Sequence, residues 1–546
     1  MESRALVAFL LSLGVFIAWG FIMTIINPPP ERRALEDSAK SVLPQKRQAP
    51  PPGVADVPAP GTQAQPVEPP PTVQPKSPFA GSEVVVHAEN NIMTVAISNR
   101  GAVVKNVFMK KYRNADGGPI DLVNHVDGDM LPLTLVSSNA AVNNILQNAF
   151  YEVSTDSLIL DPTESTGRLT LHLKHDSGLE VTREFTFHQD SYMIDVQTTI
   201  SAPAYATQNL AYMTVWGPGL GGKVSSHTDH FVFSGATSFV NDERIETPED
   251  SLSQKIEYSG ELAWTSFQNK YFAAALIPGD GIKSAVAFKT NGDVYVGLNF
   301  EAVQSAASAS HSLYVGTKEL LVLEKMGHKL MRLMDYGWIG NKFAFLVKPL
   351  LKILLYFHSL TGNYGWAIIF LTVVIKILFF PLTHKSFKSM KGLQKIQPYV
   401  KVVQERNKND RQKMNEELME LYKKHKVNPL GGCLPMLLQI PVFIALYHAL
   451  FFSIELRGAP FIGWITDLSV ADPYYVTPVL MGATMYLQQK MTPSVGDPMQ
   501  QKIMLLLPVV FTFLFVTFPA GLVIYWTVNN LLTITQQYYI YKVMKD

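Results

Sequence analysis

The pattern of hydrophobic and polar positions changes several times along the chain. Residues 5–26 form a run of 22 residues without a charge, long enough to cross about 30 Å of hydrocarbon as a helix. This run is longer than the apolar region of a signal peptide, and three prolines follow where a cleavage site would have small residues. We therefore predict an uncleaved transmembrane anchor in residues 1–26, with a cleavable signal peptide as the alternative.

Two further patterns follow this anchor. Residues 27–79 contain 15 prolines and Phe79 as the only aromatic residue, which predicts an extended linker without a core. Between residues 80 and 320, short apolar runs such as 93–97 and 192–196 alternate with period two, and glycine, asparagine and aspartate separate them. This alternation predicts one large all-β sandwich domain.

After residue 320 the chain returns to apolar blocks. Residues 321–361 mix apolar residues with Lys342, Lys348 and Lys352, which favours an amphipathic helix at the membrane interface over a span. Residues 362–546 hold five apolar blocks, which predict a five-helix core with spans near residues 364–381, 431–454, 473–489, 503–518 and 522–541. The predicted fold class is an α-helical polytopic membrane protein with a large β-sandwich domain.

Charge sets the orientation of the spans. Residues 384–428 hold 12 Lys and Arg against 5 Asp and Glu, and a short loop this basic belongs in the cytoplasm. Counting spans from this loop places both termini in the cytoplasm and the β-domain outside, where its 15 basic and 27 acidic residues suit solvent. Apolar residues at helical spacing on both sides of residues 407–410 predict a helical hairpin.

Composition agrees with a membrane protein and excludes some kinds of binding site. Hydrophobic residues make up 47% of the 546 residues, charged residues 17%, and the formal net charge is +1, which does not support nucleic-acid binding. Cys433 is the only cysteine, which excludes an intramolecular disulfide and a multi-cysteine metal site. The spans show no carboxylate pair, metal-spaced histidines or nucleophile–base arrangement, so we expect neither an enzyme nor a cofactor or metal.

Polar residues within the predicted spans mark the candidate site. Lys376 lies five residues before Pro381, where an ammonium costs about 2.5 kcal/mol or more unless it finds water or a partner. Thr372 lies one turn earlier on the same helix face. Snorkelling of Lys376 to the cytoplasmic interface is the alternative without a function.

The last span is too polar to face lipid on all sides. Its face with Tyr525 and Asn529 can meet the stripe of Thr372 and Lys376 across a bundle interior, and Trp526 lies beside it in the sequence. Gln439 could join them, although hydrogen bonding between helices explains a single amide equally well.

Several strings in residues 360–541 are distinctive. They read KVNPLGGCLP at 426–435, QIPVF at 439–443, ADPYY at 471–475, DPMQQK at 497–502 and FPAGLVIYW at 518–526. Together they resemble the YidC/Oxa/Alb family of membrane protein insertases in its Gram-negative form. The resemblance implies a hydrophilic groove open to the cytoplasm and the inner leaflet, and a periplasmic domain that is a β-supersandwich.

The resemblance also implies roles for particular residues. Lys376 stands where the family often has a groove arginine, and lysine keeps the charge without the planar fork. The groove residues then comprise Lys376, Thr372, Gln439, Tyr525, Trp526 and Asn529. The family's apolar slide, which contacts the inserting segment, maps onto Cys433, Leu434, Leu437, Ile440, Pro508, Phe511 and Phe515.

The implied function is insertion and folding of inner-membrane proteins, alone or with the Sec translocon. Expected partners are nascent membrane protein clients, the lipid bilayer, the Sec translocon, and the ribosome and signal recognition particle receptor through the basic hairpin, with no DNA. One alternative is a solute transporter, although we find no internal repeat by eye. Another is an anchored carbohydrate enzyme, which leaves the polar core unexplained.

Overall fold

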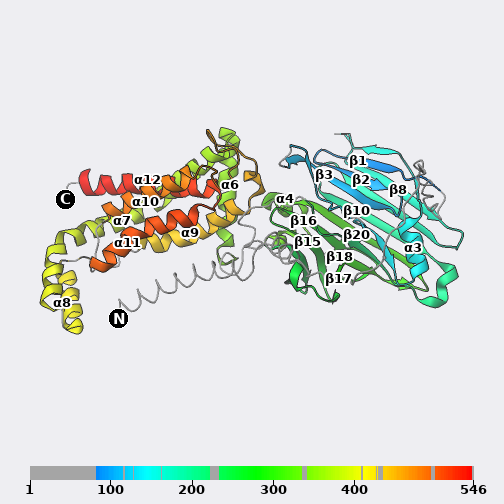
Figure 1. The fold of residues 1–546 in the computed structure, drawn as a ribbon, viewed down its shortest axis with the longest axis horizontal. Helices are drawn as coiled ribbons and strands as arrows, with labels where there is room; N and C mark the ends of the chain where they lie inside the picture. Colours follow the sequence, from blue (N-terminus) through cyan, green and yellow to red (C-terminus); the bar gives the residue numbers. More distant parts are fainter. Residues whose placement is uncertain are drawn as a thin grey trace, which may run out of the picture. The chain divides into compact units, whose positions relative to one another are not determined.

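The computed structural model of the chain describes residues 81–114, 117–126, 128–161, 163–221, 233–334, 341–407, 410–425, 427, 434–492 and 498–543. The predicted anchor and linker lie outside these residues. Within them, strands occupy the region from residue 85 to residue 317 and helices dominate from residue 320 onward (Figure 1). This division agrees with the two patterns of the sequence.

The β-domain contains the strands that the alternating pattern predicts. In chain order they are β1 Val85–Glu89, β2 Met93–Ser98, β3 Val103–Arg113, β4 Pro119–Asp121, β5 Leu135–Ser137, β6 Glu152–Val153, β7 Ser157–Ile159, β8 Thr166–Lys174, β9 Glu180–His188, β10 Met193–Ser201, β11 Tyr212–Trp216, β12 Gly235–Val240, β13 Glu243–Pro248, β14 Ile256–Tyr258, β15 Leu262–Gln268, β16 Phe272–Pro278, β17 Ile282–Thr290, β18 Asp293–Phe300, β19 Ala302–Val303 and β20 Ala306–Thr317. The expected strands at 93–97 and 192–196 are β2 and β10, so both predictions are confirmed.

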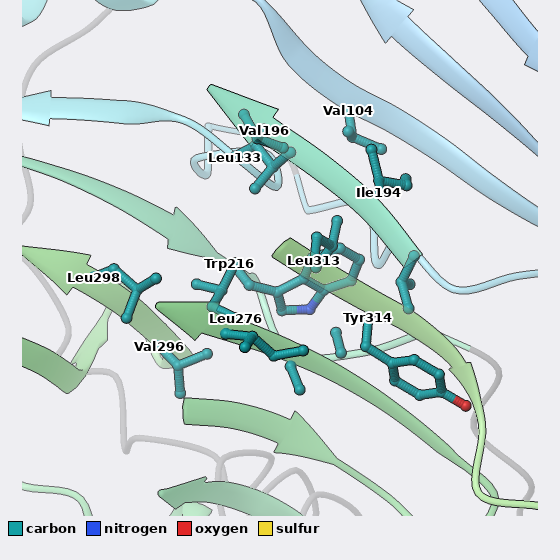
Figure 2. Close-up of a cluster of buried hydrophobic side chains, with 14 of the residues drawn as sticks. Val104, Leu133, Ile194, Val196, Trp216, Leu276, Val296, Leu298, Leu313 and Tyr314 are labelled. Atoms are coloured by element: carbon teal, nitrogen blue, oxygen red, sulfur yellow. The ribbon is translucent and has the colours of Figure 1, made fainter. Parts of the chain in front are cut away.

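These strands form three sheets. The large sheet has ten strands in the order β13-β12-β15-β16-β20-β10-β9-β8-β6, with β19 paired to β20. Two five-stranded sheets have the orders β4-β3-β2-β1-β7 and β14-β17-β18-β11-β5. Side chains from different sheets meet in one hydrophobic core, as Figure 2 shows for Trp216 and Val296 from one sheet and Leu276 and Leu313 from another. The all-β sandwich is thus confirmed.

One helix inside the β-domain was not expected. α3, Ala140–Asn148, follows β5, and its N-cap residue Asn139 accepts hydrogen bonds from the backbone N–H groups of Ala141 and Val142. Asparagine is a favoured N-cap because its side-chain oxygen satisfies donors that the first turn leaves unpaired. The helix is only 9 residues long, which makes it hard to recognise between strands.

The C-terminal region is helical where the apolar blocks predict helices. Its main helices are α6 Ala344–Thr361, α7 Tyr364–Arg406, α8 Arg411–Lys424, α9 Leu434–Phe451, α10 Val476–Met491, α11 Pro498–Phe515 and α12 Ala520–Tyr538. The short α4, Leu320–Met326, and the 3-10 turns Pro203–Gln208, Glu249–Ser251, Leu330–Leu333 and Ile454–Leu456 connect other elements, and a π-turn at Tyr539–Val543 follows α12.

α7 is longer than the predicted span. It continues through Pro381 and Pro398 as one helix of 43 residues, about 65 Å at 1.5 Å per residue. Hydrocarbon is about 30 Å thick, so the second half of this helix extends well beyond a bilayer. The first core span and the first arm of the basic hairpin are therefore a single element.

An apolar seam lies between α7 and α8. Leu393, Ile396 and Val400 of α7 are buried against an apolar face of α8 that includes Leu418 and Leu421. Asp410 caps α8, because its side chain accepts hydrogen bonds from the first two N–H groups after Arg411. The apolar seam lies inside the hairpin, so the basic residues remain on its outer faces.

Two of the described helices are long and apolar enough to cross a membrane, namely α6 and α7. Shorter apolar stretches occur in α9, at Gln439–Phe451, and in α11, at Met504–Phe515. For α6, length and hydropathy fit a span, whereas Lys348 and Lys352 within it fit the interfacial position that we predicted.

Candidate functional site

Packing of α12 brings the polar residues of the helical region together. α12 packs against both α7 and α10, while α9 packs against α6 and borders α7. Asn529, Asn530, Thr533, Gln536 and Gln537 of α12 are all buried, although every one of them is polar. Their spacing of three and four residues forms a stripe along one side of the helix. The polar stripe therefore faces other helices.

Lys376 borders a small pocket between α7, α9 and α12. The pocket is lined by Ile375, Lys376, Phe379 and Thr383 from α7, Gln439 and Val442 from α9, and Asn529 from α12. Its volume is about 30 Å³, which is room for one or two water molecules. Polar groups from three helices thus share one narrow cavity.

The ammonium of Lys376 has a neutral partner. Its Nζ donates a hydrogen bond to Oγ1 of Thr533 at 2.6 Å. The Thr533 hydroxyl in turn donates to the backbone carbonyl of Asn529 at 2.6 Å. Among the residues that the structure describes, no carboxylate forms an ion pair with Lys376. The positive charge is therefore partly buried and not compensated.

Further hydrogen bonds connect the same stripe to both neighbouring helices. Nε2 of Gln536 donates to Oγ1 of Thr383 on α7 at 2.9 Å. Toward α10, Nδ2 of Asn530 donates to Oγ1 of Thr484 at 3.3 Å. Gln537 makes the corresponding bond to Thr492, just after α10, at 3.2 Å. These bonds satisfy amides that would be costly in hydrocarbon.

The predicted groove residues divide between this pocket and the apolar core. Asn529 and Gln439 lie in the pocket with Lys376, as the sequence suggests. Thr372 shares the helix face of Lys376 but is fully buried, and its hydroxyl donates to the carbonyl of Ile368 in its own helix at 2.7 Å. Tyr525 is 1% exposed, within the apolar core of the bundle.

Trp526 lies in an aromatic cluster. Its ring packs edge-on against Phe443 of α9, with centroids 4.7 Å apart. It also contacts Phe515 at 5.2 Å and Phe511 at 6.3 Å, both on α11. Such ring pairs stabilise packing beyond the area that they bury. Trp526 thus connects the helix of the groove to the helix of the predicted slide.

The predicted slide residues do not share one environment. Pro508 and Phe515 are buried in the bundle, and Phe511 is partly buried there, whereas Ile440 of α9 is 45% exposed. Leu434 and Leu437 belong to α9, but their side chains lie outside what the structure describes. Cys433 lies outside the described residues altogether.

Two threonines near Lys376 are absent from the predicted site: Thr383 lines the pocket, and Thr533, which does not line it, accepts a hydrogen bond from Lys376. Thr533 was only one of several polar residues of the last span, yet it is the hydroxyl that reaches Lys376. Thr383 lies beyond Pro381, where we expected the span to end, but α7 continues and places it on the pocket. The spacing of Asn529 and Thr533, one helical turn, was the signal that could have identified Thr533.

The polar side chains that line the pocket are one amine, one hydroxyl and two amides. In the described ranges, no three His, Cys, Asp or Glu side chains lie close enough to hold a metal ion. The arrangement can bind and hydrate a polar group, and it can attract negative charge.

Two family models match this chain between residues 85 and 546. The family model described as the YidC periplasmic domain matches residues 85–353, and the model described as the 60Kd inner membrane protein matches residues 356–546. Together they account for both the β-domain and the helical region.

Similar proteins carry one name. The membrane protein insertase YidC of Geobacter metallireducens is 41% identical over 554 residues, covering 99% of this chain and 98% of that protein. The protein of the same name from Geobacter sulfurreducens is 42% identical over 453 residues, covering 82% and 84%. A solved structure of an active YidC insertase is 16% identical, with a TM-score of 0.36, and covers 84% of this chain and 93% of its own.

Proposed function

Because this chain belongs to the YidC family of membrane protein insertases, we propose that the pocket around Lys376 receives the polar flank of an incoming membrane segment. The family places the protein in the inner membrane, with a periplasmic domain and with membrane proteins as its clients. The observation that supports the pocket is the ammonium of Lys376, held inside the bundle by a neutral hydroxyl.

Physical chemistry explains how such a pocket helps insertion. A polar flank that crosses hydrocarbon loses its hydration, which costs several kcal/mol for each unsatisfied group. A pocket with an ammonium, two amides and room for water divides this cost into smaller steps. The pocket stabilises an acidic flank more than a neutral one, because the positive charge of Lys376 attracts a carboxylate strongly in a medium of low dielectric constant.

We also propose a route for the apolar part of the client. Burial of about 20 apolar residues in lipid supplies the driving force, so neither a nucleotide nor a covalent step is required. The aromatic cluster of Trp526, Phe511 and Phe515 adjoins α9 through Phe443. A client that moves between α9 and α11 meets this surface before it reaches lipid.

The domain limits and the orientation follow the predictions from the sequence. We propose the anchor at 1–26, the linker at 27–79, the β-domain at 80–320, an interfacial helix within 321–361 and the insertase core at 362–546. Both termini and the α7–α8 hairpin are then cytoplasmic. The basic outer faces of that hairpin support this orientation.

Further partners are part of the same proposal. The hairpin is a basic surface that suits the ribosome or the signal recognition particle receptor, and such binding weakens as salt rises. The Sec translocon is proposed as a second partner, and activity without it is proposed for small clients. We propose no catalytic residue and no cofactor. Membership in the insertase family supports insertion over solute transport.

Reconstitution tests the role of Lys376. Purified protein in vesicles without Sec components is given a single-span client whose flank carries either Asp or Asn, and protease-protected client is measured. We expect Lys376→Leu to lower insertion of the Asp client by roughly tenfold, the size of one interaction with a charged group. Lys352→Leu, which removes an exposed lysine of α6, is the matched control. Normal insertion of both clients by a folded Lys376→Leu protein would contradict the proposal.

A further inference from the structure

The hydroxyl of Thr533 is oriented by its own helix. It has a single proton, which it donates to the carbonyl of Asn529 at 2.6 Å. Its lone pairs are then available only as acceptors, and one of them accepts from Nζ of Lys376 at 2.6 Å. Thr533 is 5% exposed, so water does not compete easily for this position.

This bond fixes where the charge of Lys376 lies. A lysine has a flexible four-carbon stem, and near the end of a span it lowers its energy by extending to the interface. The Thr533 acceptor holds Nζ against α12 instead, beside the pocket. A carboxylate in the same place would cancel the charge, whereas a hydroxyl leaves it intact.

The ammonium keeps donors for another group. It has three N–H donors, and one bonds to Thr533. No other hydrogen bond of Lys376 occurs within the described part of the chain, so two donors remain, and Lys376 lines the same pocket as Gln439 and Asn529. A hydrogen-bonded ammonium with two available donors is prepared to bind a polar ligand.

We propose that Thr533 is the positioning residue for Lys376, keeping its ammonium in the pocket at membrane depth instead of at the interface. The consequence for insertion rests on the proposed function of the pocket. The position of the ammonium itself does not, and it can be measured separately.

The experiment uses four new variants of the full-length protein in vesicles, together with Lys376→Leu. Thr533→Val has nearly the same shape without an acceptor, and Thr533→Ser restores the hydroxyl. Thr535→Val is the matched control, because Thr535 is an exposed α12 threonine with a similar bond, to the carbonyl of Leu531 at 2.9 Å. The fourth variant combines Thr533→Val with Lys376→Leu.

Amine labelling reports the position of the ammonium. A membrane-impermeant amine reagent is applied on the hairpin side, and mass spectrometry gives the labelling of Lys376 relative to the exposed Lys401 of the hairpin. In Thr533→Val we expect this ratio to rise by roughly tenfold, the population shift for losing one hydrogen bond to a charged group. Thr533→Ser and Thr535→Val should stay close to the unmodified protein.

Insertion of the Asp and Asn clients is the second readout. Thr533→Val should lower the ratio of Asp-client to Asn-client insertion toward the ratio measured for Lys376→Leu. The double variant should have the same ratio as Lys376→Leu alone. An unchanged labelling ratio in Thr533→Val, or an equal rise in Thr535→Val, would overturn the positioning role. Normal insertion by Lys376→Leu would refute the function of the pocket, while the labelling result would still decide the role of Thr533.

Discussion

His311 should make the β-domain sensitive to acid. It lies on β20 opposite Val196 of β10, and alternation along the strand places its side chain on the same face of the sheet as Leu313. It is 3% exposed, and neither ring nitrogen has a hydrogen-bond partner among the described residues. Burial lowers the pKa of His311 to about 3, with a further contribution from the charge of Arg183 and a weaker opposing one from Asp195.

The sign and size of the effect follow from proton linkage. In the unfolded chain, His311 binds a proton near pH 6.5, whereas in the folded domain it stays neutral until about pH 3. Between these values the unfolded state binds more protons, so the free energy of unfolding falls by about 1.4 kcal/mol for each pH unit lost. Its contribution to stability is fully present above pH 6.5, and about 2 kcal/mol is lost by pH 5.

Hydrogen exchange measures this loss in the complete protein. The opening free energy of β10 and β20 is compared at pH 7.5 and pH 5 in detergent, after correction for intrinsic exchange rates. His311→Leu should be at least as stable at pH 7.5, because no hydrogen bond is lost. On acidification to pH 5 it should not show the loss of about 2 kcal/mol that His311 causes. His87→Leu, at an exposed position of β1, is the control. The reasoning fails if His311→Leu loses as much stability on acidification as the unmodified protein.

Two other substitutions test packing, one in the β-domain and one in the α7–α8 hairpin. Arg183 is fully buried and donates from Nη1 to the carbonyls of Ala102 and Leu133, both at 2.7 Å. Arg183→Met should lower the free energy of unfolding by about 3 kcal/mol, which is less than the loss of two hydrogen bonds to a charged group because the cost of desolvating the guanidinium is also removed. Unchanged hydrogen exchange around residues 102 and 133 would contradict this. Ile396→Ala should destabilise the hairpin by about 2–5 kcal/mol and speed hydrogen exchange in α8. Val402→Ala, at an exposed position, is the control, and an equal increase in exchange in this variant would refute the role of the buried seam.

The sequence predicted the β-domain well at the level of single strands. Alternation marks a strand with one face buried, and β2 and β10 lie where it occurs. Alternation does not say which strand is the neighbour, so the division into three sheets could not be predicted. The parallel pairing of β1 with β7, which joins His87–Glu89 to Ser157–Ile159, is one such long-range contact.

The candidate site was predictable because polar groups are exceptional in a membrane span. Lys376, Asn529 and Gln439 were selected for that reason, and the structure brings them to one pocket. The choice between two threonines was not predictable. Thr372 lies one turn from Lys376 yet bonds to its own helix, whereas Thr533 comes from another helix and reaches Nζ. Which hydroxyl points at the lysine depends on how α7 and α12 are rotated, and sequence spacing does not contain that rotation.

The apolar helices present a deeper difficulty. In a soluble protein the apolar face points inward because the other face meets water, but lipid tails are as apolar as a protein core, so this signal is lost. α11 illustrates the consequence: Phe515 is 3% exposed against the aromatic cluster, while Phe513, two residues earlier, is 76% exposed. The same residue type thus occupies both environments. A slide for clients on α11 therefore requires either that a client reach Phe511 and Phe515 by parting α9 from α11, or that it use the exposed face around Phe513. Crosslinking a stalled client to each position in turn would decide between these two routes.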